Sequence, residues 1–426
     1  MIRENQRRFS FDWVIIIIYL LLIGFGYLNI MSASHEGEIT NYLDMSESYG
    51  KQLVFMGLSV VLIVLILSVE AKFYERFASI IYVVAILSLL GLFVFGKDIN
   101  GARSWYGIGS MTIQPSEFAK FATALAVAKY ISDIQTNLKT IRDQLKAAAL
   151  IFLPALLILL QNDAGSTLVY ASFFFVFYRE GLQQIYIIIG FSLLILAVLA
   201  LKYGLTITGL LAALIIFGVY FLKRKRNNSI FKPILILIVS LIFASGVKLF
   251  YNNILKPHQQ NRISLWLRLE KDPAKLERMK KAEAYNLIQS EEAISAGGFW
   301  GKGFMQGTRT TGKFVPEQDT DYIFSTVGEE WGFLGSSFVV ILFVFLIIRI
   351  IYLAENQKSQ FSRVYGYSVA SIFFLHFTIN IGMVMGLIPT VGIPLPFISY
   401  GGSGLWSFTI LLFIFVKLDS NKINEW

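Results

Sequence analysis

Three carboxylates stand within five positions of one another near the end of a long polar segment of the chain. They are Glu317, Asp319 and Asp321, and a long apolar run follows shortly after them. Like charges this close raise one another's proton affinity, and a carboxylate tuned in this way can serve as a general base. Acids are also typical of a helix start. Composition alone therefore leaves both interpretations open.

A glutamate and a lysine form a second charged group in a mostly apolar stretch. Glu117 and Lys120 in the segment 114–120 are three residues apart, so they share one face of a helix, with Lys120 about one turn inside the apolar zone. A charge at membrane depth is costly unless it is paired. The pattern fits a structural ion pair, and with the preceding Arg103 and Trp105 it also fits a site for a pyrophosphate or a sugar.

Two further segments interrupt the apolar sequence. Asp163, followed by Gly and Ser, predicts the N-cap of a helix or, alternatively, a contact to a cation or substrate. Residues 386–403 contain three prolines and no charged residue. Non-helical backbone at membrane depth is tolerated only where it lines a cavity or is buried in protein. We therefore expect residues 386–403 to be more than a plain solvated loop.

The elements that must position these residues are membrane helices. Of the 426 residues, 55% are hydrophobic and 15% charged, whereas an average soluble domain has about 25% charged residues. This composition excludes an ordinary soluble enzyme, a disordered chain and a nucleic-acid-binding module. The absence of cysteine excludes thiolate chemistry, and three scattered histidines argue against a His-rich metal centre. Because the apolar runs do not alternate with polar residues, the fold class is all-α.

Twelve apolar runs predict a polytopic protein with about twelve transmembrane helices. Two runs are less clear, because 165–179 is short for a full crossing and 205–222 is rich in glycine. The twelve runs cover approximately residues 11–31, 52–70, 76–96, 115–131, 145–161, 165–179, 184–202, 205–222, 231–250, 334–353, 365–387 and 401–418.

The Lys and Arg residues of the short loops predict that both termini are cytoplasmic. With the N-terminus inside, the inside loops hold about 18 of these residues, and the short outside loops hold Lys51, Lys97 and Arg103. The long loop at 251–333 then lies on the extracytoplasmic face. It is expected to contain either a solvated amphipathic helix or a lid over an active site. We expect residues 1–426 to form a single membrane domain.

Together, these motifs resemble the SEDS family of bacterial cell-shape and division proteins. The resemblance covers most of the chain in the family's order, and its last motif is the most specific. The sequence is more similar to the elongation member of the family than to the division member. The resemblance is carried by Arg103-x-Trp105, residues 114–120, Gln161-x-Asp163-x-Gly165, Gly301-x-Gly303, residues 316–321, Gly328-Glu329-Glu330 and residues 389–403.

The resemblance implies a peptidoglycan glycosyltransferase in the cytoplasmic (inner) membrane. Such an enzyme polymerises lipid II on the extracytoplasmic face, releases undecaprenyl pyrophosphate and works with a class B penicillin-binding protein. Membrane lipid would surround it, and neither nucleic acid nor an organic cofactor is implied. Family members have ten transmembrane helices, so the runs at 205–222 and 231–250 would be an extra pair. Asp319 stands where the family usually has His, and Tyr322 where it usually has Phe.

The resemblance also implies roles for individual residues. The family's catalytic aspartate corresponds to Asp321, the expected general base, and Lys120 is its expected charge partner. Arg103 is expected to contact the pyrophosphate and Trp105 a sugar face, and a divalent cation, Mg or Mn, would assist. The metal's ligands stay unassigned. The remaining candidates for substrate binding are Gln114, Glu117, Asp163, Glu317, Thr320, Ser399 and Tyr400.

Two functions of other classes remain open. A flippase for a lipid-linked precursor would need essential charges in the middle of the membrane and alternating access, whereas the acids of this sequence gather at the outer mouth. A non-catalytic scaffold for a penicillin-binding protein is not excluded, but it leaves Asp321 and Lys120 unexplained.

Overall fold

The computed structural model describes residues 11–35, 41–99, 101–109, 111–223, 229–282 and 284–422. The predicted topology rests partly on basic residues that lie outside the described residues. These are Arg3, Arg7 and Arg8 and the basic residues at 224–226. Most of the described chain is helical, as the composition predicts.

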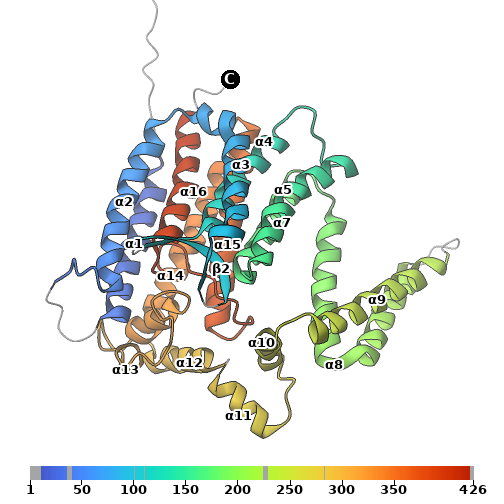
Figure 1. Ribbon diagram of the computed structural model, residues 1–426. Coiled ribbons are helices and arrows are strands. Elements are labelled where there is room, and N and C mark those ends of the chain that lie inside the picture. The colour runs from blue at the N-terminus through green and yellow to red at the C-terminus, as the bar shows by residue number, and fades with distance from the viewer. Residues whose placement is uncertain are drawn as a thin grey trace, which may run out of the picture. The chain divides into compact units, whose positions relative to one another are not determined.

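Sixteen α-helices and one 3-10 helix (η1) are found in the described part of the chain (Figure 1). They are α1 (Trp13–Ser34), α2 (Ser48–Ser68), α3 (Ala71–Phe95), α4 (Pro115–Ile131), α5 (Ile141–Leu160), α6 (Ala164–Val169), η1 (Tyr170–Ser172), α7 (Phe173–Arg179), α8 (Gln184–Lys223), α9 (Phe231–Asn253), α10 (Pro257–Leu267), α11 (Pro273–Lys281), α12 (Tyr285–Gly297), α13 (Thr308–Thr311), α14 (Ile323–Glu355), α15 (Gln360–Val384) and α16 (Gly402–Asn421).

The chain divides into two compact units. The first consists of residues 1–182, 289–385 and 391–426, and the second of residues 183–288 and 386–390. The single membrane domain with one long loop stays a prediction. In this division the loop up to residue 288 belongs to the second unit, and its later part, with Asp321, belongs to the first.

Each apolar run of the sequence is helical in the structure. Among the described residues, nine helices are long and apolar enough to cross a membrane. The shorter α4 and the segment of α6, η1 and α7 account for two more runs. The runs at 184–202 and 205–222 both lie in α8, whose backbone is non-helical at Gly204 (φ 77°, ψ 172°). The number of crossings remains a prediction.

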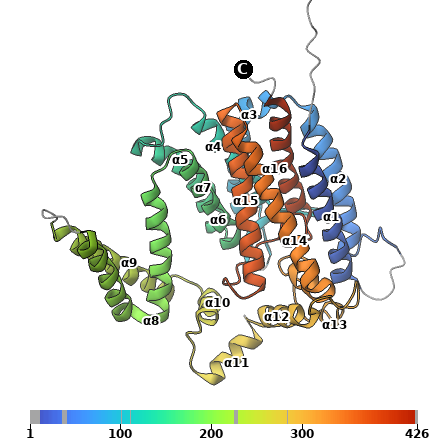
Figure 2. The ribbon, with the colours of Figure 1, turned by 180° about the vertical axis from the view of Figure 1, so that it is seen from behind.

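The first unit is a bundle in which α16 is the central helix. Helix α16 packs against α2, α4 and α15, and α15 also packs against α4 and α14. Both views show α14, α15 and α16 side by side (Figures 1 and 2). Of the most apolar window of α16, 83% is buried, compared with 22% for α3. The site residues on α4 and α15 therefore lie within the most enclosed part of this unit.

A small antiparallel sheet between α3 and α4 is the local departure from the all-α expectation. Its strands are β1 (Lys97–Ile99), β2 (Ala102–Ile108) and β3 (Met111–Ile113), in the order β1-β2-β3. Lys97 lies opposite Trp105. Strands β1 and β3 have three residues each, too few to show an alternation of polar and apolar residues, and the seven residues of β2 do not alternate strictly. For this reason the sequence pattern did not predict the sheet that carries Arg103 and Trp105.

Helix α14 begins directly after the acidic motif (Glu317, Asp319 and Asp321) and bends at Gly332 (φ 62°, ψ −154°). A side chain at Gly332 would collide with the backbone nitrogen of Gly301, so the two backbones approach each other closely. The N–H of Gly303 donates to the carbonyl oxygen of Glu330 at 2.9 Å. The preceding loop thus satisfies part of the backbone that the bend leaves unpaired, which explains why a broken helix is stable here.

Candidate active site

Asp321 lies at the start of α14, with its backbone fixed and its side chain only partly buried. Its carbonyl oxygen accepts a hydrogen bond from Nδ2 of Asn380 at 2.8 Å. Its Oδ2 lies 3.1 Å from the position that a Cβ would take at Gly392, where φ is 77°. The carboxylate therefore lies directly against the backbone of Gly392. A side chain at that position would be strained and would crowd the acid.

The other two acids of the motif accept hydrogen bonds from hydroxyl groups. Asp319 accepts a hydrogen bond from Oγ of Ser48 at its Oδ2, at 2.9 Å. Glu317 is exposed, and its Oε2 accepts from Oγ1 of Thr320 at 3.0 Å. Both acids thus stabilise the conformation of the motif. The three carboxylates thus have different surroundings, and Asp321, whose Oδ2 lies against Gly392, stays the predicted general base.

Ser399 and Tyr400, in the proline-rich segment (residues 386–403), bind the backbone of the acidic motif. Oγ of Ser399 donates to the carbonyl oxygen of Thr320 at 2.7 Å. The N–H of Tyr400 donates to the backbone carbonyl oxygen of Asp319 at 2.8 Å. Burial raises the pKa of the Tyr400 phenol, and the carboxylate of Asp319 raises it further. The phenol therefore stays neutral near pH 7 and is not a base. In this structure both residues position the motif, and their predicted contact with substrate remains a prediction.

Lys120 is buried and paired with Glu117. Its Nζ lies 2.7 Å from Oε1 of Glu117 and 2.9 Å from Nε2 of His376, and the two charged side chains are 2% and 3% exposed. The ammonium also lies 5.2 Å from the ring centre of Phe408, in a cation–π arrangement. The expected direct pair between Lys120 and Asp321 is not formed in the described structure. Instead, Lys120 pairs with the carboxylate one turn earlier on its own helix, because burial strongly favours the nearest opposite charge.

His376 and Asn380, which no sequence motif predicts as site residues, connect this ion pair to the acidic motif. They are one turn apart on α15 and fully buried. Nδ1 of His376 lies 3.1 Å from the carbonyl oxygen of Pro394, and Nδ2 of Asn380 donates to that of Ile393 at 2.7 Å. In the sequence, two polar residues at i and i+4 within the apolar run at 365–387 could have indicated that this helix face contributes to a site.

Gln114 and Asp163 form part of the framework around α4 and α6. Asp163 caps α6, since its Oδ1 accepts from the N–H of Ser166 at 2.9 Å, which confirms the N-cap interpretation. Its Oδ2 accepts from Nε2 of Gln114 at 3.0 Å. The N–H of Gln114 in turn donates to Oγ of Ser403 at 3.1 Å. These bonds join the residues just before α4 and α6 to the first turn of α16.

Arg103 and Trp105 lie on β2. The side chain of Arg103 is exposed, and its Nε donates to the carbonyl oxygen of Gly96 at 3.1 Å. Its N–H donates to the carbonyl oxygen of Gln161 at 3.0 Å. The backbone is thus fixed while the guanidinium faces the surroundings, as an anion-binding arginine requires. The hydrogen bonds of Arg103 thus connect β2 to the backbone at Gly96 and Gln161.

Glu329, from the Gly-Glu-Glu motif, has a structural explanation. This fully buried carboxylate accepts hydrogen bonds from Nζ of Lys302 at 2.7 Å and from the N–H groups of Arg309 and Thr310 at 3.0 and 2.8 Å. Its neighbour Glu330 accepts from the hydroxyl of Ser32. Glu329 therefore binds the loop at 302–310 to α14, and Glu330 joins α14 to α1.

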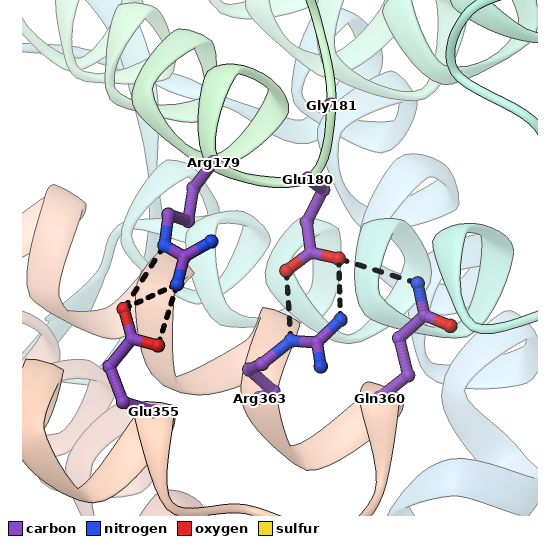
Figure 3. A pocket seen from close by; sticks show the side chains of 6 residues that line it. All are labelled: Arg179, Glu180, Gly181, Glu355, Gln360 and Arg363. Carbon is purple, nitrogen blue, oxygen red and sulfur yellow. Dashed lines mark hydrogen bonds and ion pairs between the residues drawn. The ribbon is translucent and has the colours of Figure 1, made fainter.

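A separate pocket of about 460 Å³ lies where α14 ends and α15 begins (Figure 3). In it, Arg179 faces Glu355 and Arg363 faces Glu180, each pair joined through two nitrogens of the guanidinium. No predicted site residue lines it, so it is not the candidate active site.

The described residues do not fit a metal ion held by the protein alone. Within the part of the chain that the structure describes, no group of three or more His, Asp or Glu side chains comes together as metal ligands. A hard cation such as Mg²⁺ can also be bound through one or two carboxylates with substrate phosphates and water. The expected requirement for a divalent cation remains a prediction, and no step proposed below passes through a metal.

The fold and the site define an integral membrane protein with a buried ion pair and a carboxylate at the end of a helix bundle. Comparison with known proteins identifies the family. The model of the FtsW/RodA/SpoVE family, described as "Cell cycle protein", matches residues 12–207 and 179–424. The chain therefore belongs to this family, which confirms the resemblance to SEDS proteins.

Two relatives show how far the similarity extends. The chain is 31% identical over 444 residues to the peptidoglycan glycosyltransferase RodA of Treponema pallidum, with 97% of this chain and 98% of the relative covered. It is 31% identical over 396 residues to the peptidoglycan glycosyltransferase MrdB of Escherichia coli K12, with 92% and 89% covered. Similarity thus extends over nearly the whole length of both relatives.

Solved structures share the fold. One, described as "Structural coordination of polymerization and crosslinking by a peptidoglycan synthase complex", matches with a TM-score of 0.67 and 22% identity over 98% of this chain and 99% of that chain. The crystal structure of Thermus thermophilus RodA matches with a TM-score of 0.60 and 21% identity over the same shares. Both confirm the helical membrane fold.

Proposed function

We propose that this chain is a peptidoglycan glycosyltransferase that polymerises lipid II during cell elongation. Family membership and relatives that carry this activity in their names support the proposal. The observation that carries it is the placement of Asp321. Its carboxylate lies at the start of α14 against Gly392, on a backbone fixed by Asn380.

In the proposed reaction, Asp321 acts as the general base. The acceptor is a sugar hydroxyl, a poor nucleophile that needs a base within about 3 Å. The proton of that hydroxyl passes to the carboxylate of Asp321 as the oxygen attacks the anomeric carbon of the donor sugar. The bond between that carbon and the pyrophosphate oxygen breaks. Its electron pair leaves with undecaprenyl pyrophosphate.

The leaving pyrophosphate needs positive charge, and the exposed Arg103 on β2 is the proposed source. A guanidinium can bind phosphate oxygens with two parallel hydrogen bonds. Trp105 on the same strand would stack on a sugar face. Lys120 is enclosed by Glu117 and His376, so we assign it an indirect role in holding the site rather than a contact with phosphate.

We also propose that the site faces the extracytoplasmic side and that both termini are cytoplasmic. The distribution of Lys and Arg supports this orientation. A reporter inserted after Arg226, outside the described residues, should score as cytoplasmic. A periplasmic score would remove one span and reverse the predicted side of Asp321.

A class B penicillin-binding protein is the proposed partner. The similarity of fold to a chain from a structure described as a peptidoglycan synthase complex supports this proposal. The two functions are complementary, since polymerised strands are the substrate of a crosslinking transpeptidase.

Purified protein and labelled lipid II test the proposed function. We expect glycan strands on a gel when the wild-type chain is supplied with lipid II and a divalent cation, with more product when the partner is present. Strands that form only with the partner, and that a mutation in the partner abolishes while Asp321→Asn does not, would favour a scaffold. Transfer of lipid II between leaflets without polymer would favour a flippase.

A further inference from the structure

His376 lies between the buried ion pair and the segment that supports Asp321. Its ring is fully buried, with Phe408 packed against it edge-on at 4.8 Å between ring centres. A backbone carbonyl oxygen can only accept a hydrogen bond, so the proton on the ring belongs to Nδ1, which faces the carbonyl of Pro394. An ammonium can only donate, so Nε2 accepts from Lys120. These partners define a neutral ring in one tautomer and one orientation.

The residue one turn later on the same helix face supports the same segment. Asn380 uses the two hydrogens of its amide to hold the carbonyl oxygens of Ile393 and Asp321, at 2.7 and 2.8 Å. His376 holds the next carbonyl along, that of Pro394. Residues 393 and 394 are thus anchored to α15 at two successive carbonyls, and the preceding Gly392 lies against the carboxylate of Asp321.

We propose that His376 is a positioning residue for the glycosyl transfer, an inference that rests on the proposed function. The ion pair of Lys120 and Glu117 orients the ring, and the ring's Nδ1–H fixes the carbonyl of Pro394. This in turn fixes Gly392, and with it the position of the Asp321 carboxylate relative to the acceptor hydroxyl. His376 touches neither substrate nor the reacting atoms.

Three substitutions separate the two hydrogen bonds of the ring. His376→Asn places an amide N–H near the position of Nδ1 and can keep the bond to Pro394, but it gives up the bond to Lys120. His376→Gln extends to the position of Nε2 and can accept from Lys120, but it loses the bond to Pro394. His376→Phe keeps a ring against Phe408 and loses both bonds.

The chain has no cysteine, so a single introduced cysteine reports the position of the segment without any need for activity. Ile393 is 1% exposed. Ile393→Cys should react slowly with a water-soluble thiol reagent while Pro394 is anchored. We expect its modification rate to rise at least tenfold with His376→Phe and His376→Gln and to stay within threefold with His376→Asn. Ala128→Cys, at a fully buried position on α4, is the matched control and should stay slow in all backgrounds.

Polymerisation in the cysteine-free variants gives the second readout. We expect kcat to fall at least tenfold with His376→Phe and His376→Gln and less than fivefold with His376→Asn, with KM for lipid II within twofold throughout. An unchanged modification rate at Ile393→Cys with His376→Phe would overturn the proposal. So would equal effects of Asn and Phe, or a loss expressed in KM alone. If the wild-type chain makes no polymer, the proposed function fails, while thiol modification still decides whether His376 anchors the segment.

Discussion

Helices α14 and α15 have charged groups at both of their ends, and the two ends are built differently. Where α14 ends and α15 begins, two arginine–glutamate pairs line an open pocket (Figure 3). Arg179 and Glu355 are 51% and 43% exposed. At the other ends, Lys120 and Glu117 are almost fully enclosed, and a neutral histidine and an asparagine join them to the Asp321 motif.

The two ends therefore have different roles. We call the two ion pairs at the pocket, Arg179–Glu355 and Arg363–Glu180, the clasp, and the end with Asp321 is the candidate active site. At the pocket, each arginine is paired with a glutamate, and these ion pairs hold neighbouring elements together. The Arg179–Glu355 pair is largely exposed and therefore contributes little free energy. At the Asp321 end, backbone carbonyls, glycines and neutral donors fix the position of a carboxylate that remains partly exposed. Preorganised surroundings of this kind are what an acid–base group requires. The comparison predicts large effects on activity at one end and small ones at the other.

The largest effect is expected from Asp321→Asn. The amide is nearly isosteric but cannot accept the acceptor's proton, so the initial rate of lipid II polymerisation should fall by about 10²–10⁴-fold. The thermal midpoint and co-purification with the partner should be unchanged, because the backbone bond to Asn380 does not involve the carboxylate. Wild-type-like turnover by this variant would remove the base assignment.

Lys120→Ala should come next. It leaves Glu117 as an uncompensated buried carboxylate, and breaking such a pair from one side costs about 3–5 kcal/mol of unfolding free energy. Activity should fall sharply, and Lys120→Arg should rescue it only partly, because a planar guanidinium does not replace a compact ammonium.

A double-mutant cycle sharpens this prediction. In thermal stability, Lys120 should couple strongly to Glu117. In activity, it should also couple to Asp321, through His376 and the segment at 391–394. Coupling to Glu117 with none to Asp321 would leave Lys120 as a purely structural residue.

Asp319→His, which restores the residue usual in the family, should change activity only a few-fold. The carboxylate of Asp319 accepts a hydrogen bond from Ser48, and a histidine nitrogen can accept the same bond. The check is the initial rate beside that of Asp321→Asn. If both variants lose activity equally, the two acids act as a coupled pair.

The smallest effect is expected at the clasp. Arg179→Ala should lower the free energy of unfolding by about 0–1 kcal/mol, because both partners of this ion pair are largely exposed. Polymerisation should remain within twofold of the wild type. A loss of activity comparable to that of Lys120→Ala would show that the pocket is more than a clasp.

The sequence predicts the helices and the residues of the site better than it predicts their partners. The apolar runs locate the membrane helices because the requirement for about 20 apolar residues dominates composition. The motif of Asp321 and the charge of Lys120 are visible in the sequence, since acids and lysines are rare in such surroundings.

The packing of segments that are distant in the sequence determines what the sequence alone could not predict. Lys120 could pair with Glu117 or Asp321, and the packing of α4 against α15 and α16 decides between them by enclosing the nearer pair. His376 and Asn380 point to a site only once the proline-rich segment is known to present its carbonyls to them. The short strands that carry Arg103 arise from pairing between neighbouring segments, which no single segment reveals.

Chemical rescue of the missing carboxylate tests the central claim most directly. Asp321→Ala opens a space into which formate can bind, and polymerisation of labelled lipid II is followed with increasing formate or, as a control, formamide. If the carboxylate of Asp321 is the base, the variant makes no glycan strands alone or with formamide, and strands return with formate. Strands formed by Asp321→Ala at the wild-type rate without formate would contradict the account.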